Sequence, residues 1–398
     1  WILFCASATL LAVSTACGGA AAPGSTSAAP SASAAPASSA AAASGAAASA
    51  GGAGAAPPSA SAAGSGAGAS AGAASAATKP SGATTTISTG HLASSADIGT
   101  YVAIERGYFA AQGVKADLQL FKTSADEIPA LASGQLLVGA GGVNAGLFNA
   151  VAQGIPMVIA ADQNNDPPGF KGVGWVVRQD LVDKVKEPKD LKGLTIGMGS
   201  TGSVIDTELD VLLKQGGLTI KDVTLKSVAY PDQVAAMANK SIDVTYAFQP
   251  FITLMQSQKL ATLWKASGEI VPNHEATVIL YSPAVAQKYP AAAKGWMVGY
   301  LKGVRDVVSE YSKNNNGLPD DLVQILAKYG ALKDPNQLKK LLLPGMNPDG
   351  TPNKDSLKID LDYFVRAGFV KNPPDLNKVV DTTYVDNAIS KLGKYQAS

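Results

Sequence analysis

Two stretches of this chain share one pattern: IPALASGQLLVGA at residues 128–140 and VAAMANKSIDVTYA at residues 234–247. In each, apolar residues at helical spacing are followed by a short turn and then by an apolar run that predicts a strand. A loop follows both strands. The repetition predicts two similar lobes, each built from helices packed on a sheet.

Strand-like and helix-like segments alternate on both sides of these stretches, which predicts α/β lobes whose helices cover a parallel or mixed sheet. About 310 residues follow Thr84, more than one hydrophobic core usually serves, so two domains are expected. The expected strands are 84–89, 115–121, 136–139, 157–161, 194–197, 223–228 and 276–281, and the expected helices are 99–111, 125–133, 145–153, 204–215 and one from residue 291. That last helix carries an apolar stripe expected in the core: Trp296, Tyr300, Leu301, Val304, Val307, Val308 and Tyr311.

Charge is confined to the part of the chain after residue 78. All 32 Lys and Arg and all 31 Asp and Glu lie there, and the net charge is +1. A near-neutral balance without a basic stripe gives no electrostatic footprint for nucleic acid. No polyanionic partner is therefore expected.

The N-terminal part is expected to direct export and tether the protein. Residues 1–16, WILFCASATLLAVSTA, have the length of a signal-peptide apolar region, with its start expected to be missing. Cys17 follows Ala16 as in a bacterial lipobox, although Ser14 stands where Leu, Val or Ile is usual. Residues 17–83 combine this lipid-anchor Cys with a linker of Ala, Ser, Gly and Pro, expected to be disordered.

The cysteine count restricts the chemistry. Cys5 and Cys17 are the two cysteines of the sequence, and both precede the part with globular composition. Disulfides, thiolate catalysis and zinc–cysteine sites are therefore excluded from the folded body. His91 and His274 are far apart in sequence, so no histidine-based metal or catalytic constellation is visible.

The segment AIERGYF at residues 103–109, followed by Gly113 and Val114, resembles the opening of the nitrate/sulfonate/taurine and pyrimidine-precursor family of ABC substrate-binding proteins. The resemblance extends over about residues 84–398. It continues through ALASG at 130–134, GIPMV at 154–158, DLKG at 190–193, QPF at 249–251 and VVDTTYVD at 379–386.

The resemblance implies a type II periplasmic-binding-protein fold, in which two α/β lobes joined by two crossover strands close on a ligand in the cleft between them. Crossing strands are expected around Trp175 and Thr277, with lobe I over 84–175 and 282–398 and lobe II over 176–281. The implied function is that of an extracytoplasmic lipoprotein of an ABC importer. It would pass a small anionic solute, of sulfonate, taurine or nitrate type, to a membrane permease, acting as a monomer without cofactor, metal or catalysis.

Ligands of open α/β sheets bind beyond the carboxyl ends of the strands. The loop GMGSTGS at 197–203 is the strongest candidate, because its glycines let the backbone turn and a helix N-terminus favours negative charge. The loop GHLASSAD at 90–97 would face it. The serines and Asp97 could equally cap the helices that follow. The expected ligand contacts are Ser94, Ser95, Asp97, Gly142, Asn144, Gln163, Ser200, Thr201, Gly202, Ser203, Tyr230 and Gln249.

Two departures from the family pattern bear on the ligand. Members that bind aminopyrimidines tend to carry His where this chain has Asp97, and many members have a carboxylate where it has Gln249. Both differences count against a pyrimidine ligand.

Three other functions compete with solute binding. Residues 197–202 fit the dinucleotide pattern G-x-G-x-x-G, but the acidic residue expected about twenty residues later would be Asp222, which precedes its strand. The family's cytosolic branch makes a pyrimidine precursor with pyridoxal phosphate, and the export signal argues against it. An adhesion module on a stalk would also use the linker, but repeated lobes around a cleft favour solute capture.

Overall fold

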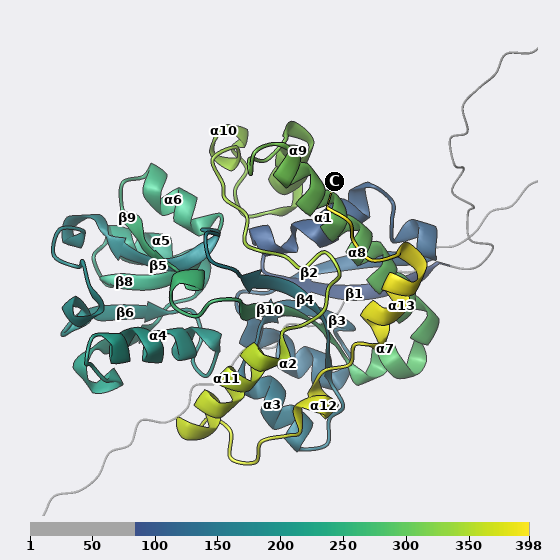
Figure 1. The fold of residues 1–398 in the computed structure, drawn as a ribbon, viewed down its shortest axis with the longest axis horizontal. Helices are drawn as coiled ribbons and strands as arrows, with labels where there is room; N and C mark the ends of the chain where they lie inside the picture. Colours follow the sequence, from purple (N-terminus) through teal and green to yellow (C-terminus); the bar gives the residue numbers. More distant parts are fainter. Residues whose placement is uncertain (1–83, 398) are drawn as a thin grey trace, which may run out of the picture. The chain divides into compact units, whose positions relative to one another are not determined.

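The computed structural model describes residues 84–397 and consists of two five-stranded sheets with helices around them (Figure 1). The first sheet has the strand order β2-β1-β3-β10-β4 and the second the order β7-β6-β8-β5-β9. We call the first sheet and its helices lobe I, and the second sheet and its helices lobe II. The α/β architecture with two lobes, expected from the sequence, is confirmed.

Lobe I contains strands β1 (Thr85–His91), β2 (Val114–Leu120), β3 (Val138–Gly142), β4 (Val158–Asp166) and β10 (His274–Tyr281). Its helices are α1 (Ile98–Glu105), α2 (Ser124–Ser133), α3 (Ala145–Ala152), α7 (Pro283–Lys288), α8 (Pro290–Lys313), α9 (Asp320–Tyr329), α10 (Pro335–Leu338), α11 (Lys354–Arg366), α12 (Leu376–Val379) and α13 (Thr383–Leu392).

Lobe II contains strands β5 (Val173–Arg178), β6 (Thr195–Met198), β7 (Thr224–Ser227), β8 (Val244–Phe248) and β9 (Ala261–Ala266). Its helices are α4 (Val204–Gln215), α5 (Tyr230–Ala238) and α6 (Phe251–Ser257). Figure 1 shows these elements in teal, grouped apart from lobe I.

The two sheets share one plan. The first three strands of each order are parallel neighbours, and the fourth strand, β10 or β5, is antiparallel to the strands on both its sides. The repeated sequence pattern occupies the same place in both lobes: α2 leads into β3 and α5 leads into β8, each third in its sheet. The two lobes are therefore similar, as the repetition predicts.

The strand pairing places the lobe boundaries at other residues than the sequence predicted. Trp175 lies in β5 and pairs with Tyr246 of lobe II, whereas Thr277 lies in β10 and pairs with Gly142 of lobe I. The chain therefore passes between lobes at residues 167–172 and 267–273, and β10 belongs to lobe I rather than lobe II. An apolar strand carries the same pattern in either sheet, so periodicity could not assign β10.

Helix α8 packs in the core of lobe I. Its predicted apolar stripe is buried except for Val308, which is half-buried. Helix α1 crosses it at close range, because a Cβ on Gly303 would lie 2.1 Å from the carbonyl oxygen of Gly99. The helix expected over 99–111 ends earlier, at Glu105. Gly107 has a positive φ of 68°, which breaks the helix before a short 3-10 turn at Ala110–Gln112.

Several expectations fall outside the described residues. The signal peptide, the lipidation of Cys17 and the linker all lie before residue 84. Between residues 84 and 397, none of the helices combines the length and apolar character needed to cross a bilayer.

Candidate functional site

A cavity of about 40 Å³ lies between the lobes, with room for about three water molecules at ~10–15 Å³ each. Lobe I contributes the start of the 3-10 turn η1 (Ser95–Asp97), the start of α2 and residues of β3, β4 and β10. Lobe II contributes the loop after β6, the start of α4, and aromatic residues of α5 and β8. The site is thus built where strands end and helices begin.

Backbone hydrogen bonds join the lobes on both sides of this cavity. On one side the Ala145 N–H donates to the Gly202 carbonyl at 2.7 Å, and the Val204 N–H donates to the Val143 carbonyl at 3.1 Å. On the other side the Ser95 N–H donates to the carbonyl of Gln249 at 3.0 Å. The structure therefore represents a closed arrangement of the two lobes.

The wall from lobe I is organised by Asp97. Its Oδ2 accepts from the Ser94 N–H at 2.8 Å and from the Ser94 hydroxyl at 2.9 Å, and its Oδ1 accepts from the Gln163 amide at 2.9 Å. Asp97 and Gln163 lie behind the cavity wall rather than in it. Ser95 does line the cavity, and its hydroxyl is buried without a hydrogen-bond partner in the structure.

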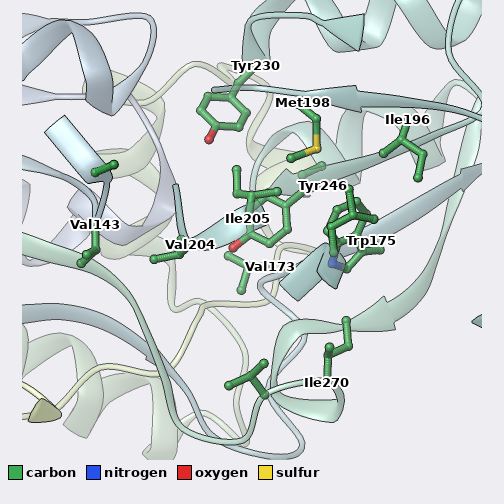
Figure 2. Close-up of a cluster of buried hydrophobic side chains, with 14 of the residues drawn as sticks. Val143, Val173, Trp175, Ile196, Met198, Val204, Ile205, Tyr230, Tyr246 and Ile270 are labelled. Atoms are coloured by element: carbon green, nitrogen blue, oxygen red, sulfur yellow. The ribbon is translucent and has the colours of Figure 1, made fainter. Parts of the chain in front are cut away.

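The wall from lobe II is organised by the loop after β6. The Ser203 N–H donates to Asp206 at 2.9 Å, so this serine caps α4 while it also lines the cavity. The ring of Tyr230 lies against Gly199, where a Cβ would come within 2.2 Å of a ring carbon, and it packs on Phe248 with centroids 4.6 Å apart. Figure 2 shows Tyr230 and Val204 among the buried hydrophobic side chains of one cluster.

The expected contacts divide into two groups. The residues that line the cavity are Ser94, Ser95, Gly142, Ser200, Ser203 and Tyr230. The others lie outside the lining. Asn144 caps α3 by accepting from the Leu147 N–H, Gln249 accepts from the Thr253 hydroxyl, and Thr201 borders a separate surface depression. Gly202 supplies the interlobe carbonyl from a left-handed backbone with φ of 71°.

Some lining residues were not among the expected contacts. Ser124 is the first residue of α2, and its hydroxyl accepts from the Gly142 N–H at 2.6 Å. It could have been found from its place just after the expected second strand. Tyr246 and Val173 sit inside strands that read as core, so the sequence carried no signal for them. The rest of this group is Leu92, Ala96, Asn164, Val204, Ile205, Phe248, Ala276, Thr277 and Pro344.

The electrostatic surroundings of the cavity are acidic. Burial raises the pKa of Asp97, that of Glu127 to about 8 and that of Asp206 to about 6. Within residues 84–397 the lining contains no Lys, Arg or His. His91 contacts the Tyr101 hydroxyl at 2.8 Å, and His274 lies in a separate buried network.

The glycines of the dinucleotide-like pattern serve contacts within the protein. A Cβ on Gly197 would meet Ile242 at 2.8 Å, Gly199 supports Tyr230, and Gly202 faces Ala145. Protein atoms therefore occupy the space beside these glycines that a pyrophosphate would need. Residues 84–397 also place no group of His, Cys, Asp and Glu side chains that could hold a metal ion.

Comparison with known proteins shows similarity to binding proteins. The NMT1/THI5-like family matches residues 95–311. A Brucella abortus (strain 2308) protein, named provisionally as a binding protein, is 25% identical over 290 residues, which cover 69% of this chain and 83% of that protein.

Solved structures share the fold at low identity. The ligand-binding component of an ABC-type import system from Staphylococcus aureus, with zinc bound, has a TM-score of 0.63 at 14% identity and covers 76% of this chain and 98% of its own. The nitrate-binding protein NrtA from Synechocystis PCC 6803 has a TM-score of 0.63 at 15% identity, and the match covers 78% of this chain and 89% of that protein. The alkanesulfonate-binding protein SsuA from Xanthomonas axonopodis pv. citri, bound to MOPS, has a TM-score of 0.59 at 18% identity. The match covers 77% of this chain and 99% of that protein. The desulfurization enzyme DSZB has a TM-score of 0.53 at 12% identity, and the match covers 77% of this chain and 99% of that protein.

Proposed function

Because this chain belongs to the NMT1/THI5-like family, we propose that it is the solute-binding component of an ABC importer. In this role it captures a small molecule between its lobes outside the cytoplasmic membrane and delivers it to a permease. The fold it shares with ligand-binding components of import systems supports this role.

One observation carries the proposal: a cavity lined by both lobes lies where backbone hydrogen bonds join the lobes. Ser94 and Ser95 face it from lobe I, and Ser200, Ser203 and Tyr230 face it from lobe II. A solute there contacts both lobes only when they are closed, so it binds the closed form more tightly than an open one. Such differential affinity is what allows a ligand to shift a conformational equilibrium.

The proposal includes no chemical step. Nucleophilic catalysis needs a nucleophile held by an adjacent base. The two cavity hydroxyls that the structure places on a carboxylate, Ser94 on Asp97 and Ser203 on Asp206, form capping boxes at helix starts. This arrangement suits binding, even though the fold also occurs in the desulfurization enzyme.

We further propose that the protein is a monomer attached to the membrane through a lipid on Cys17, with residues 18–83 as a tether. Replacing Cys17 with Ser should move the protein from the membrane fraction to the soluble fraction of cells that express it. Retention of the C17S variant in the membrane fraction would contradict lipid attachment, and it would leave the solute-binding proposal intact.

The function is tested by thermal unfolding of the full chain with candidate solutes, because a ligand that binds the native state alone raises the melting temperature. Any bound solute is first removed by unfolding and refolding. The matched variants are Ser200→Phe, which fills the cavity, and Thr201→Phe, which changes the adjacent residue outside it. S200F should abolish the shift and T201F should keep it. Equal shifts in both variants would remove this cavity from the function.

A further inference from the structure

The cavity differs from an anion site in its lining. An anion moved from water into a closed cavity loses its hydration, which a cationic side chain or oriented N–H donors must replace. Among residues 84–397 the lining consists of hydroxyl, amide, aromatic and aliphatic groups, without a cationic side chain. Behind the lining lie the carboxyl groups of Asp97 and Asp206, which accept hydrogen bonds at the helix starts.

Helix N-termini could replace a cationic side chain, but here they are already occupied. The Ser94 N–H donates to Asp97 and the Ser203 N–H donates to Asp206, so each helix start carries a carboxylate of its own. The next amides along the chain, Ser95 N–H and Val204 N–H, donate to carbonyls of the opposite lobe. The partial positive charge at these helix starts is therefore offset before any solute arrives.

Glu127 is a further carboxyl group behind the cavity, on the side of lobe I. Its side chain is fully buried, its Oε2 accepts from the Ala140 N–H at 3.1 Å, and its Oε1 has no partner. It lies under the strand end at the cavity, since a Cβ on Gly141 would come within 2.8 Å of the Ser124 hydroxyl and 3.4 Å of Glu127 Oε2. None of the carboxyl groups of Asp97, Asp206 and Glu127 behind the cavity offers an anion a positive partner.

A cationic solute would also lack a direct partner. Asp97 and Asp206 are engaged by the helix starts, and none of these carboxylates borders the cavity. The groups that remain for a ligand are hydroxyls, above all that of Ser95, which is 1% exposed and unpartnered. Tyr230, Tyr246 and Phe248 add aromatic surface on the side of lobe II.

We propose that the solute is uncharged, with a polar group that hydrogen-bonds the Ser95 hydroxyl and an apolar part against the aromatic wall of lobe II. This inference rests on the solute-binding function proposed above. It replaces the anionic solute expected from the glycine- and hydroxyl-rich loop at 197–203.

The test uses compounds of equal shape that differ in charge. The planar set is acetate, acetamide and acetamidinium, the larger set is benzoate, benzamide and benzamidinium, and methanesulfonate is compared with methanesulfonamide. Each is added to the refolded full chain, and the melting temperature and the calorimetric affinity are measured at low and high NaCl. The neutral member of at least one set should bind at least tenfold more tightly than its charged counterparts. Its affinity should not change with salt, because screening acts on charge.

The outcomes separate the two proposals. Tighter binding of a carboxylate, a sulfonate or an amidinium overturns the uncharged solute and leaves solute capture standing. The absence of a shift with every compound counts against capture of small solutes in this cavity, and the inference fails with it.

Ser95→Ala should reduce the affinity for the neutral compound about tenfold, whereas Ser133→Ala, an exposed serine on α2, should leave it unchanged. Equal affinity in S95A and wild type removes Ser95 from recognition. Should S95A not fold, Tyr230→Phe tests the phenol of the opposite wall.

Discussion

The Nε2 atom of His274 lies 3.0 Å from Oδ1 of Asp360, and the Nδ1 atom of the same ring lies 3.1 Å from Oε1 of Glu208. All three side chains are fully buried. Glu208 belongs to α4 of lobe II and Asp360 to α11 of lobe I, while His274 begins β10 just after the chain crosses between lobes. Glu208 also accepts from the Trp175 indole and the Ser267 hydroxyl. The crossing is therefore held by a buried charged network that both lobes share.

Replacing His274 with Gln should destabilise the protein strongly. Burial alone lowers the pKa of His274, but Asp360 and Glu208 raise it well above its ordinary value, so the ring is charged. Without it two buried carboxylates lose their counter-charge, a change that costs about 3–5 kcal/mol. Denaturant unfolding of H274Q measures the loss. His91→Gln is the control, since His91 lies outside this network and its ring contacts the neutral Tyr101 hydroxyl, a change that should cost about 1 kcal/mol. Equal losses would argue against a charged His274.

Stability should fall as the pH rises from about 5.5 to 8. Burial raises the pKa of Glu127 and Asp166 to about 8 and that of Asp162 to about 7. Since these values exceed those of the unfolded chain, the native state binds more protons between about pH 4 and 8. The stabilisation is complete below the unfolded pKa and is lost as the pH passes the folded pKa. His274, whose pKa is also raised, acts in the same direction above about pH 6.5.

Melting temperatures measured between pH 5.5 and 8 in buffers of equal ionic strength check this expectation. The lowered pKa of Asp180, to about 2 through its hydrogen bond with Arg178, acts in a more acidic range and does not interfere. A melting temperature that rises over this interval would contradict the buried acids.

Substituting Ala for Gly199 should displace the ring of Tyr230 from the cavity wall. The new Cβ would lie 2.2 Å from a ring carbon, too close for both to remain in place. Such overpacking costs about 1–3 kcal/mol, and solute affinity should fall at least tenfold. A double-mutant cycle provides the control: in a Tyr230→Ala background, G199A should add little further destabilisation, because the clash is gone. Additive effects would show that Gly199 acts through another contact.

Substituting Ala for Gly303 should separate α8 from α1. Its Cβ would lie 2.1 Å from the carbonyl oxygen of Gly99, so the helices must move apart at a cost of about 1–3 kcal/mol. Gly295→Ala in the same helix is the matched control, because its nearest neighbour, Gln112 Cβ, lies at 3.1 Å. Urea unfolding of both variants should show the larger loss for G303A, and the reverse order would place the tight contact elsewhere.

The sequence predicted the elements of this fold better than their assembly. The helix at Val204–Gln215 has the expected bounds, because Ser203 and Asp206 form a capping box in front of an amphipathic run. The lobe to which β10 belongs depends on pairing with β3 and β4, which lie more than a hundred residues away. Local periodicity contains no information about that choice.

The candidate site shows the same division. Serines that follow strands and precede helices, such as Ser95 and Ser203, were predictable from their position. Asp97 and Gln249 were predicted by the same rule but are used within the protein, since each accepts hydrogen bonds from its own loop or helix. Tyr246 lines the cavity from inside strand β8, where the apolar sequence predicts a core position.

The place of β10 also determines the order in which the chain can fold. Lobe I needs His274–Tyr281 between β3 and β4, yet these residues are synthesised after all five strands of lobe II. Residues 173–266 are in effect an insertion that can pair its own strands while the sheet of lobe I still lacks its fourth member. Contacts that close such a long loop form slowly because of the entropy they cost. During synthesis, the edges of β3 and β4 therefore lack their partner strand until the residues of β10 have been made.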